Sequence, residues 1–371
     1  MFSKYLVENL SYQLNNLFNS FTYLGGEYCL LIGIFFLILI ELRPKSAPKN
    51  IALAIAVMSI CASIFWLFIS FRNISPKGQY LFGEMLFLNS FNIKIKILFG
   101  FIGFLTFIFL ACSSIYKQKK FPFSEWFLFI LTIELGLYIL VASQNLLAIY
   151  ISLEIISLVS YILVALPFKK ENAEASIKYL LFGAFTTGIT LYGMSLLYGL
   201  TGSLDMNLTV ININFNAVKT PLWLIAFFLT CGSLFFKISS LPFHFWTPDV
   251  YQGAPSWVTS FMSTAVKTAG FAALFRLFNY SFLPLSGTWF VIFSILAAIS
   301  ITVGTFSAVF QTSLKRILAF SSIAHAGYML IILLNGENTT GAGLLFYTLA
   351  YSIASLVAFA TIVAVEGSTG N

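Results

Sequence analysis

The sequence predicts an all-α integral membrane protein, a polytopic bundle of about eleven transmembrane helices. Of its 371 residues, 59% are hydrophobic and only 9% are charged, whereas about a quarter of the residues in a soluble domain carry a charge. The hydrophobic residues form runs of about 20, the length that a helix needs to cross a bilayer core. Short polar links separate the runs, and the alternating pattern of membrane β-strands is absent from the sequence.

The apolar runs place the predicted spans along the chain. In order they are 27–42, 51–71, 97–116, 124–142, 145–166, 174–200, 222–250, 256–282, 286–310, 315–334 and 341–365. The first three carry no charge near their centres, so region 1–123 is interpreted as three packing helices. Residues 1–20 lack the basic start and small-residue cleavage site of a signal peptide, so we expect the first span to be retained.

The basic residues behind the net charge of +7 are distributed so that they indicate the orientation of the chain in the membrane. Links after the first, third, fifth and ninth spans carry about twice as many basic residues as the alternate links. They are Arg43, Lys45, Lys49, Lys117, Lys119, Lys120, Lys169, Lys170, Lys315 and Arg316. The positive-inside rule places these links in the cytoplasm and the amino terminus outside. This distribution accounts for the basic surplus, so we expect no nucleic-acid partner.

The cysteines do not indicate a metal or redox site. Cys29, Cys61, Cys112 and Cys231 lie within or at the edge of predicted spans and show no CxxC spacing. We therefore expect no metal ion, iron–sulfur cluster or disulfide in this chain.

Three ionisable residues lie deep in predicted spans: Glu154 in the fifth, Lys237 in the seventh and Lys267 in the eighth. A charge at the centre of such a helix costs roughly 2.5 to 3.5 kcal/mol on insertion scales, and charges there usually face the bundle interior and mark ion or proton routes. We expect both lysines to be functional and Glu154 to be their counter-ion or a proton carrier. The alternative for Glu154 is an ordinary polar contact between helices.

The seventh span is predicted to be broken. The run KISSLPFHFWTPDVYQGAP places Pro242 and Pro248 within or just past an apolar segment, and proline removes a backbone donor and clashes with the preceding turn. Broken helices at membrane depth line hydrated cavities and ion sites in transporters. Freed carbonyls, with Ser239 and Ser240, could hold water beside Lys237.

Four further side chains are candidates with open alternatives. Lys178 lies only about one turn inside the sixth span, so its ammonium could instead reach the membrane surface. Glu134 is central in the fourth span but has no obvious partner. His325 falls mid-span, where a relay or a packing role is possible, and a histidine suits a proton relay. His244 adjoins the helix break and could simply cap freed carbonyls.

Together these groups predict a proton route. A nearby carboxylate favours the charged form of a buried lysine, so movement of Glu154 away from Lys237 would release a proton. Water could carry that proton to Lys267 and onward.

Four segments carry a resemblance to a known family. They read SLEIISLVSYILVAL, EASIKYLLFGAFTTGITLYGMSLLYGLTG, FKISSLPFHFWTPDVYQGAPSWVTSFMSTAVKTAGFAALFRLF and QTSLKRILAFSSIAHAGYML. They resemble the antiporter-like membrane subunits of respiratory complex I, NADH:quinone oxidoreductase, and most of all its N-type subunit, called subunit 2 in mitochondria. The resemblance covers about residues 124 to 365 and is most specific in PFHFWTPDVYQGAP.

The resemblance implies a proton-pumping translocase subunit of the respiratory chain. Glu154 would pair with Lys237, and Lys267 would be the central relay. Two inverted five-helix repeats are implied, the first at 124–283 and an incomplete second at 284–371. NADH, FMN, iron–sulfur clusters and quinone would belong to other subunits, leaving no redox centre here. The implied partners are other membrane subunits of complex I, the lipid bilayer and protons, in a bacterial inner membrane or a mitochondrial inner membrane.

Two departures from the family keep rival functions open. The sequence stops at Asn371, about three spans short of the family pattern, as in a fragment or a split or truncated gene, and Glu134 has no place in that pattern. The rivals are a subunit of a multisubunit sodium/proton antiporter, which shares the core residues, and a structural membrane subunit that conducts no protons.

Overall fold

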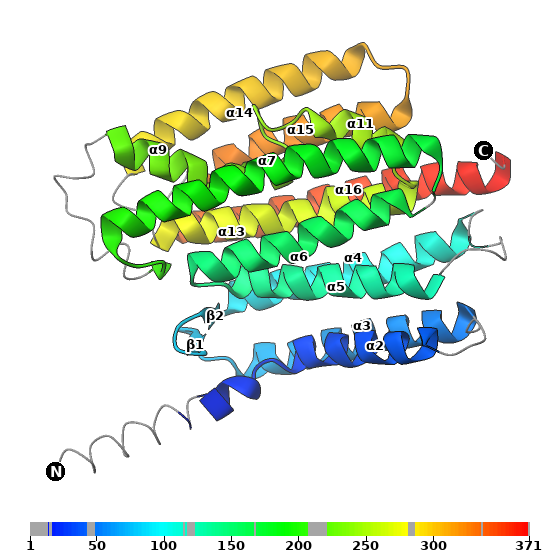
Figure 1. The fold of residues 1–371 in the computed structure, drawn as a ribbon, viewed down its shortest axis with the longest axis horizontal. Helices are drawn as coiled ribbons and strands as arrows, with labels where there is room; N and C mark the ends of the chain where they lie inside the picture. The colour runs from blue at the N-terminus through cyan, green and yellow to red at the C-terminus, as the bar shows by residue number, and fades with distance from the viewer. Residues whose placement is uncertain are drawn as a thin grey trace.

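The computed structural model describes residues 17–42, 49–113, 123–166, 168–206, 221–280, 286–334 and 337–369, together with residues 14 and 116. Of the predicted basic links, Arg43, Lys45, Lys117, Lys119 and Lys120 lie outside the described residues. Figure 1 shows long helices lying side by side, with α2 and α3 on one side of the bundle, α4 and α5 beside them and α14 on the opposite side.

Helices make up nearly all of the described chain. They are α2 (Gly25–Glu41), α3 (Lys49–Asn73), α4 (Ser90–Cys112), α5 (Phe123–Ala142), α6 (Leu146–Ala165), α7 (Lys170–Thr201), α9 (Pro221–Thr230), α10 (Gly232–Ile238), α11 (Trp246–Gly253), α12 (Ser256–Phe261), the π-helical turn η2 (Met262–Val266), α13 (Lys267–Tyr280), α14 (Ser286–Val309), α15 (Leu314–Leu333) and α16 (Glu337–Thr369).

Two of the described helices, α4 and α6, begin at an asparagine that caps the first turn. Asn89 precedes α4 and accepts a hydrogen bond from the backbone N–H of Asn92 at 2.9 Å. Asn145 caps α6 in the same way, through the backbone N–H of Leu147. Side-chain oxygens at these positions satisfy backbone donors that the first turn of a helix leaves without partners.

The described helices confirm an integral membrane protein. Nine described helices are long and apolar enough to cross a membrane when α12, η2 and α13 are counted as one. The bent pair of α9 and α10 raises this number to ten if it is one span. Helix α2, which corresponds to the first predicted span, has 17 residues and is not among them. The seventh predicted span, 222–250, is broken into α9, α10 and α11, with a bend of 43° between the first two.

A β-hairpin, which the sequence analysis did not predict, links α3 to α4. Its strands, β1 (Gln79–Leu81) and β2 (Leu86–Leu88), pair antiparallel. Buried Arg276 of α13 holds the hairpin against the bundle by donating to the backbone oxygens of Phe87 and Val141 and to the side chain of Gln144. We call this end of the bundle, where α3 and α5 end and α4 begins (Figure 1), the hairpin end.

Candidate functional site

Lys237 lies in the last turn of α10, and its side chain is enclosed by aromatic residues. Only 3% of the residue is exposed, and Nζ donates a hydrogen bond to the Tyr179 hydroxyl of α7 at 3.0 Å. The ammonium also lies 5.1 to 5.7 Å from the ring centres of Tyr161, Tyr179 and Phe236. A cation over aromatic faces is stabilised more strongly when water is excluded, so this cage can hold a charged lysine inside the bundle.

The segment after Lys237 has the broken geometry that its prolines predict. Helix α10 ends at Ile238, and the next residue, Ser239, adopts a left-handed conformation with φ 59°. The hydroxyls of Ser239 and Ser240 and Nδ1 of His244 are buried, with no hydrogen-bond partner among the described residues. Pro242 lies in the same turn. Buried polar groups of this kind are normally satisfied by water, which agrees with the hydrated break expected from the sequence.

Glu154 of α6 does not contact Lys237 directly. No ion pair within 4.0 Å joins them in the described part of the chain, where all salt bridges involve other residues. Glu154 is partly buried, and its Oε1 atom has no hydrogen-bond partner there. Tyr179 takes the place beside the ammonium that the sequence analysis gave to the carboxylate. A Glu154–Lys237 interaction therefore has to act at longer range or through water.

Lys267 begins α13 directly after the π-helical turn η2 and reaches α15. Its Nζ atom donates to the backbone oxygen of Ser322 at 2.7 Å and to its hydroxyl at 2.9 Å, and the residue is 1% exposed. Single π-helical turns inside α-helices occur often at functional sites. The extra residue in this turn shifts the direction of every following side chain, and the sequence analysis did not predict it.

A cavity of about 110 Å³ lies beside Ser322, large enough for water molecules. Besides apolar side chains, its lining includes Ser263, Ser321, Ser322, His325, Tyr351 and Ser355. Nδ1 of His325 shares a hydrogen bond of 2.8 Å with the Tyr347 hydroxyl of α16. The structure thus brings two predicted residues, Lys267 and His325, to one polar region.

Helices α10 and α13 approach each other closely next to both lysines. A Cβ atom on Gly270 would lie 2.7 Å from Cγ2 of Ile238 and 3.7 Å from Cβ of Lys237. The small residue at position 270 therefore permits the contact that sets α10, with Lys237, against the helix that begins at Lys267.

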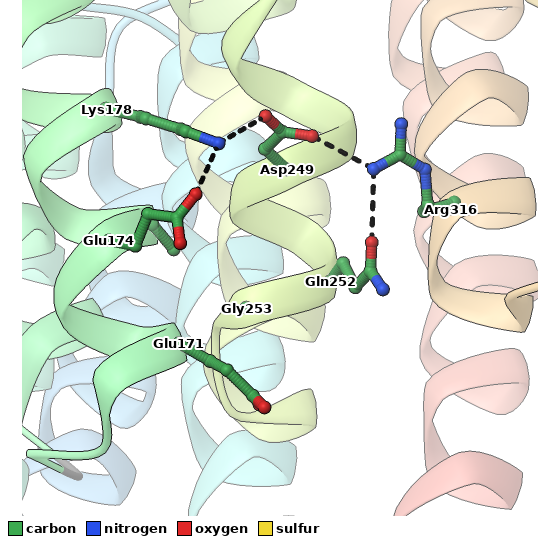
Figure 2. Close-up of a pocket in the computed structure, with 8 residues that line it drawn as sticks. Glu171, Glu174, Lys178, Asp249, Gln252, Gly253 and Arg316 are labelled. Carbon is green, nitrogen blue, oxygen red and sulfur yellow. Dashed lines mark hydrogen bonds and ion pairs between the residues drawn. The ribbon is translucent and has the colours of Figure 1, made fainter.

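Lys178 lies elsewhere, at a pocket of about 280 Å³ at the opposite end of the bundle from the hairpin. Its ammonium binds Glu174 at 2.8 Å and Asp249 at 2.9 Å, and Asp249 also binds Arg316 at 2.9 Å (Figure 2). Gln252 accepts a further bond from Arg316. The Lys178 side chain is 41% exposed and is paired with two carboxylates, in contrast to the buried Lys237 and Lys267.

Glu134 is separate from both lysines and lies among the first helices. It is fully buried in α5, and neither carboxyl oxygen has a hydrogen-bond partner among the described residues. A Cβ atom on Gly103 of α4 would lie 1.8 Å from Oε1, so the carboxyl fills the space that this glycine leaves open.

The sequence analysis did not identify the polar partners of the three lysines, which are Tyr179 for Lys237, Ser322 for Lys267 and Asp249 for Lys178. Tyr179 directly follows Lys178, and Asp249 stands within the PFHFWTPDVYQGAP run. Asp249 was visible there as a carboxylate beside a proline break, whereas nothing in the sequence marks Tyr179 as the residue that binds Lys237.

A profile of the family described as NADH:quinone oxidoreductase/Mrp antiporter, TM, matches residues 143–371. The chain belongs to this family. The matched region includes Glu154, Lys237, Lys267 and His325, whereas Glu134 lies before it. The site around Lys237 and Lys267 therefore lies in the antiporter-like part of a membrane subunit.

Individual relatives of this antiporter-like chain are similar over most of its length. NADH-quinone oxidoreductase subunit N of Coxiella burnetii is 36% identical over 82% of the chain, and that of Trichlorobacter lovleyi is 38% identical over 76%. A chain of respiratory complex I from Thermus thermophilus, solved with bound aureothin, superposes over 91% of this chain and 70% of its own length with a TM-score of 0.76 and 31% identity. The matched regions span 63% and 58% of the two subunit N relatives.

Proposed function

We propose that the chain is an N-type membrane subunit of a proton-translocating NADH:quinone oxidoreductase and that its buried lysines carry the protons. The observation that carries the proposal is the pair of lysines, each at most 3% exposed and each held by hydroxyl groups instead of a carboxylate. A buried cation without a direct counter-ion is costly. Such a lysine can gain and lose a proton when a distant charge moves.

Each polar group has a role in this proposal. Glu154 acts on Lys237 at longer range, and Tyr179 holds the ammonium. Water at the break, beside Ser239, Ser240 and His244, would carry protons to Lys237. From there they would pass to Lys267, into the water of the cavity beside Ser322 and on to the His325–Tyr347 pair.

The similarity to the relatives also suggests what the other subunits of the complex would contribute. NADH oxidation, FMN, iron–sulfur clusters and quinone reduction would lie in partner subunits, and this chain would receive their energy through neighbouring membrane subunits. We place it in a bacterial inner membrane with the amino terminus outside. Its regions would be 1–123 with packing helices, 124–283 as a five-helix repeat and 284–371 as part of an inverted second repeat, within about eleven spans.

Proton pumping in vesicles containing the assembled complex tests the proposal. Lys237→Ala is compared with wild type and with Lys77→Ala, which removes an exposed lysine before the hairpin. We expect Lys237→Ala to assemble and to lose pumping together with coupled quinone reduction, while Lys77→Ala retains both. Unchanged pumping in Lys237→Ala would overturn the proposal and leave a structural subunit. Sodium uptake without a redox reaction would instead identify the sodium/proton antiporter.

A further inference from the structure

A second group of buried ionisable residues lies in the seam between α2, α3, α4 and α5, outside the region matched by the family profile. Lys96 of α4 and Glu27 of α2 form an ion pair of 2.5 Å, with 1% and 6% of their side chains exposed. The sequence analysis described residues 1–123, which include α2, α3 and α4, as three packing helices. A buried ion pair is a poor device for packing, because apolar residues of similar volume usually stabilise a protein as well or better.

Tyr138 connects the ion pair to the middle of the seam. It is fully buried on α5, its hydroxyl accepts a hydrogen bond from Ser63 of α3 at 3.2 Å, and its ring centre lies 5.7 Å from the Lys96 ammonium. Tyr138 also follows Glu134 by four residues, which places both on the same face of α5. The groups Glu27, Lys96, Tyr138 and Glu134 therefore run from the hairpin end toward the centre of the bundle.

Two acceptors in this seam have no hydrogen-bond partner among the described residues. One is the Glu134 carboxyl, both of whose oxygens are buried and whose Oε1 atom lies against Gly103. The other is Oε2 of Glu27, because Lys96 binds only Oε1. An isolated carboxylate inside an apolar region is strongly unfavourable, and such a group takes up a proton instead. Glu134 in this position is therefore a carboxylic acid, and Glu27 offers a free oxygen to a proton arriving along the seam.

We propose that Glu134 is a proton-carrying carboxyl that exchanges its proton with the hairpin end of the bundle through Tyr138 and the Glu27–Lys96 pair. The Glu134 O–H gives its proton through water to the Tyr138 hydroxyl, which passes its own proton toward Oε2 of Glu27, and the Glu134 carboxylate left behind is reprotonated by the next proton that water in the seam delivers. Glu27 then releases a proton at the hairpin end, and Lys96 keeps its charge. Besides these four groups, the titratable side chain that acts on Tyr138 here is Cys29 of α2.

The proposal deepens the proposed function and rests on it, so the test measures the two separately. The assembled complex is prepared as wild type, Glu134→Gln, Gly103→Ala and Thr106→Val. Glutamine keeps the shape of a neutral glutamic acid but has no acid proton. Alanine at position 103 keeps the acid but displaces its carboxyl. Thr106→Val is the matched control, because among the described residues the buried Thr106 hydroxyl, on the same helix as Gly103, bonds only to the backbone oxygen of Ile102.

Protons translocated per electron pair and redox-induced infrared difference spectra are the two readouts. We expect Glu134→Gln to pass electrons to quinone, to translocate fewer protons per electron pair and to lose one carboxylic-acid carbonyl band of the wild-type spectrum. Gly103→Ala should shift that band and lower the ratio, while Thr106→Val should match wild type. An unchanged ratio overturns the proposal, because the acid would then be structural. A spectrum in which every carbonyl band of the wild type persists in Glu134→Gln also overturns it, because Glu134 would then undergo no change during turnover.

The route is tested with the double variant Glu27→Leu, Lys96→Met, which removes both charges together and so leaves neither buried alone. We expect it to assemble, to keep the Glu134 carbonyl band and to exchange that carboxyl proton for deuterium more slowly than wild type. Exchange at the wild-type rate would overturn the route. Loss of pumping in Lys237→Ala with full pumping in Glu134→Gln would reject this inference and leave the proposed function standing. Full pumping in Lys237→Ala would reject the proposed function itself.

Discussion

Lys267 and Ser322 are joined by two hydrogen bonds across the contact between α13 and α15, one to the serine backbone oxygen and one to its hydroxyl. Both acceptors are uncharged, and the residue is buried. These two oxygens stabilise the charged ammonium of Lys267. Among the described residues no carboxylate forms an ion pair with it that would favour the charged form further. The same serine lines the water-sized cavity that leads to His325.

Removal of the Ser322 hydroxyl should weaken this site. Ser322→Ala deletes one of the two bonds to the ammonium, and a hydrogen bond to a charged group contributes roughly 1.5 to 3 kcal/mol. We expect about tenfold slower proton translocation in an assembled complex, measured with a pH-sensitive dye in vesicles. Ser294→Ala on α14 is the control, because in the described part of the chain the Ser294 hydroxyl bonds only to the backbone oxygen of Phe290 in its own helix. Equal rates in the two variants would contradict the role given to Ser322.

Loss of the Tyr179 hydroxyl should lower coupled activity, because this uncharged group holds the Lys237 ammonium. Tyr179→Phe keeps the aromatic face over Lys237 but removes the hydroxyl that accepts its hydrogen bond. The lost bond is of the charged kind, so a decrease in coupled quinone reduction of about tenfold or more is expected. Tyr192→Phe on the same helix, where the side chain is exposed, should resemble wild type. Identical activities for the two variants would show that the aromatic cage alone positions Lys237.

The sequence predicts the spans well because apolar runs and bilayer thickness set them directly. It also predicts the break after Lys237, since Pro242 disrupts a helix whatever surrounds it. The partners of the buried lysines could not be predicted, because Tyr179 and Ser322 lie 58 and 55 residues away from them in the chain and meet them only through packing.

Other features escaped prediction for local reasons. Glu27 and Lys96 lie near the ends of apolar runs, where a charge can usually reach the surface, so nothing in the sequence indicated that they are buried together. The hairpin strands are three residues each and lie in a polar link. The π-helical turn at Met262–Val266 leaves no periodic signal in the sequence.

The charges around Asp249 should contribute little to stability. Asp249→Asn removes the ion pairs to Lys178 and Arg316, but these side chains are 30 to 41% exposed, and exposed pairs typically contribute under about 1 kcal/mol. We expect a melting temperature close to that of wild type, with the remaining difference disappearing as salt is raised. Glu171→Gln in the same pocket is the control. A loss of several kcal/mol would mean that the cluster is buried by a partner subunit in the complex.

Arg276 should be one of the most sensitive positions for stability. Arg276→Met keeps an apolar stem of similar length but removes the guanidinium donor from the buried oxygens of Phe87, Val141 and Gln144, of which the Phe87 oxygen keeps the side-chain amide of Asn92 as a second donor. Each buried group left unsatisfied costs about 1 to 3 kcal/mol, so the hairpin should detach from α13 and the purified protein should melt at a clearly lower temperature. Arg72→Met, at an exposed position at the end of α3, should melt as wild type. Equal melting of both variants would show that the hairpin is held by its apolar contacts, because the guanidinium would then add nothing measurable to its attachment.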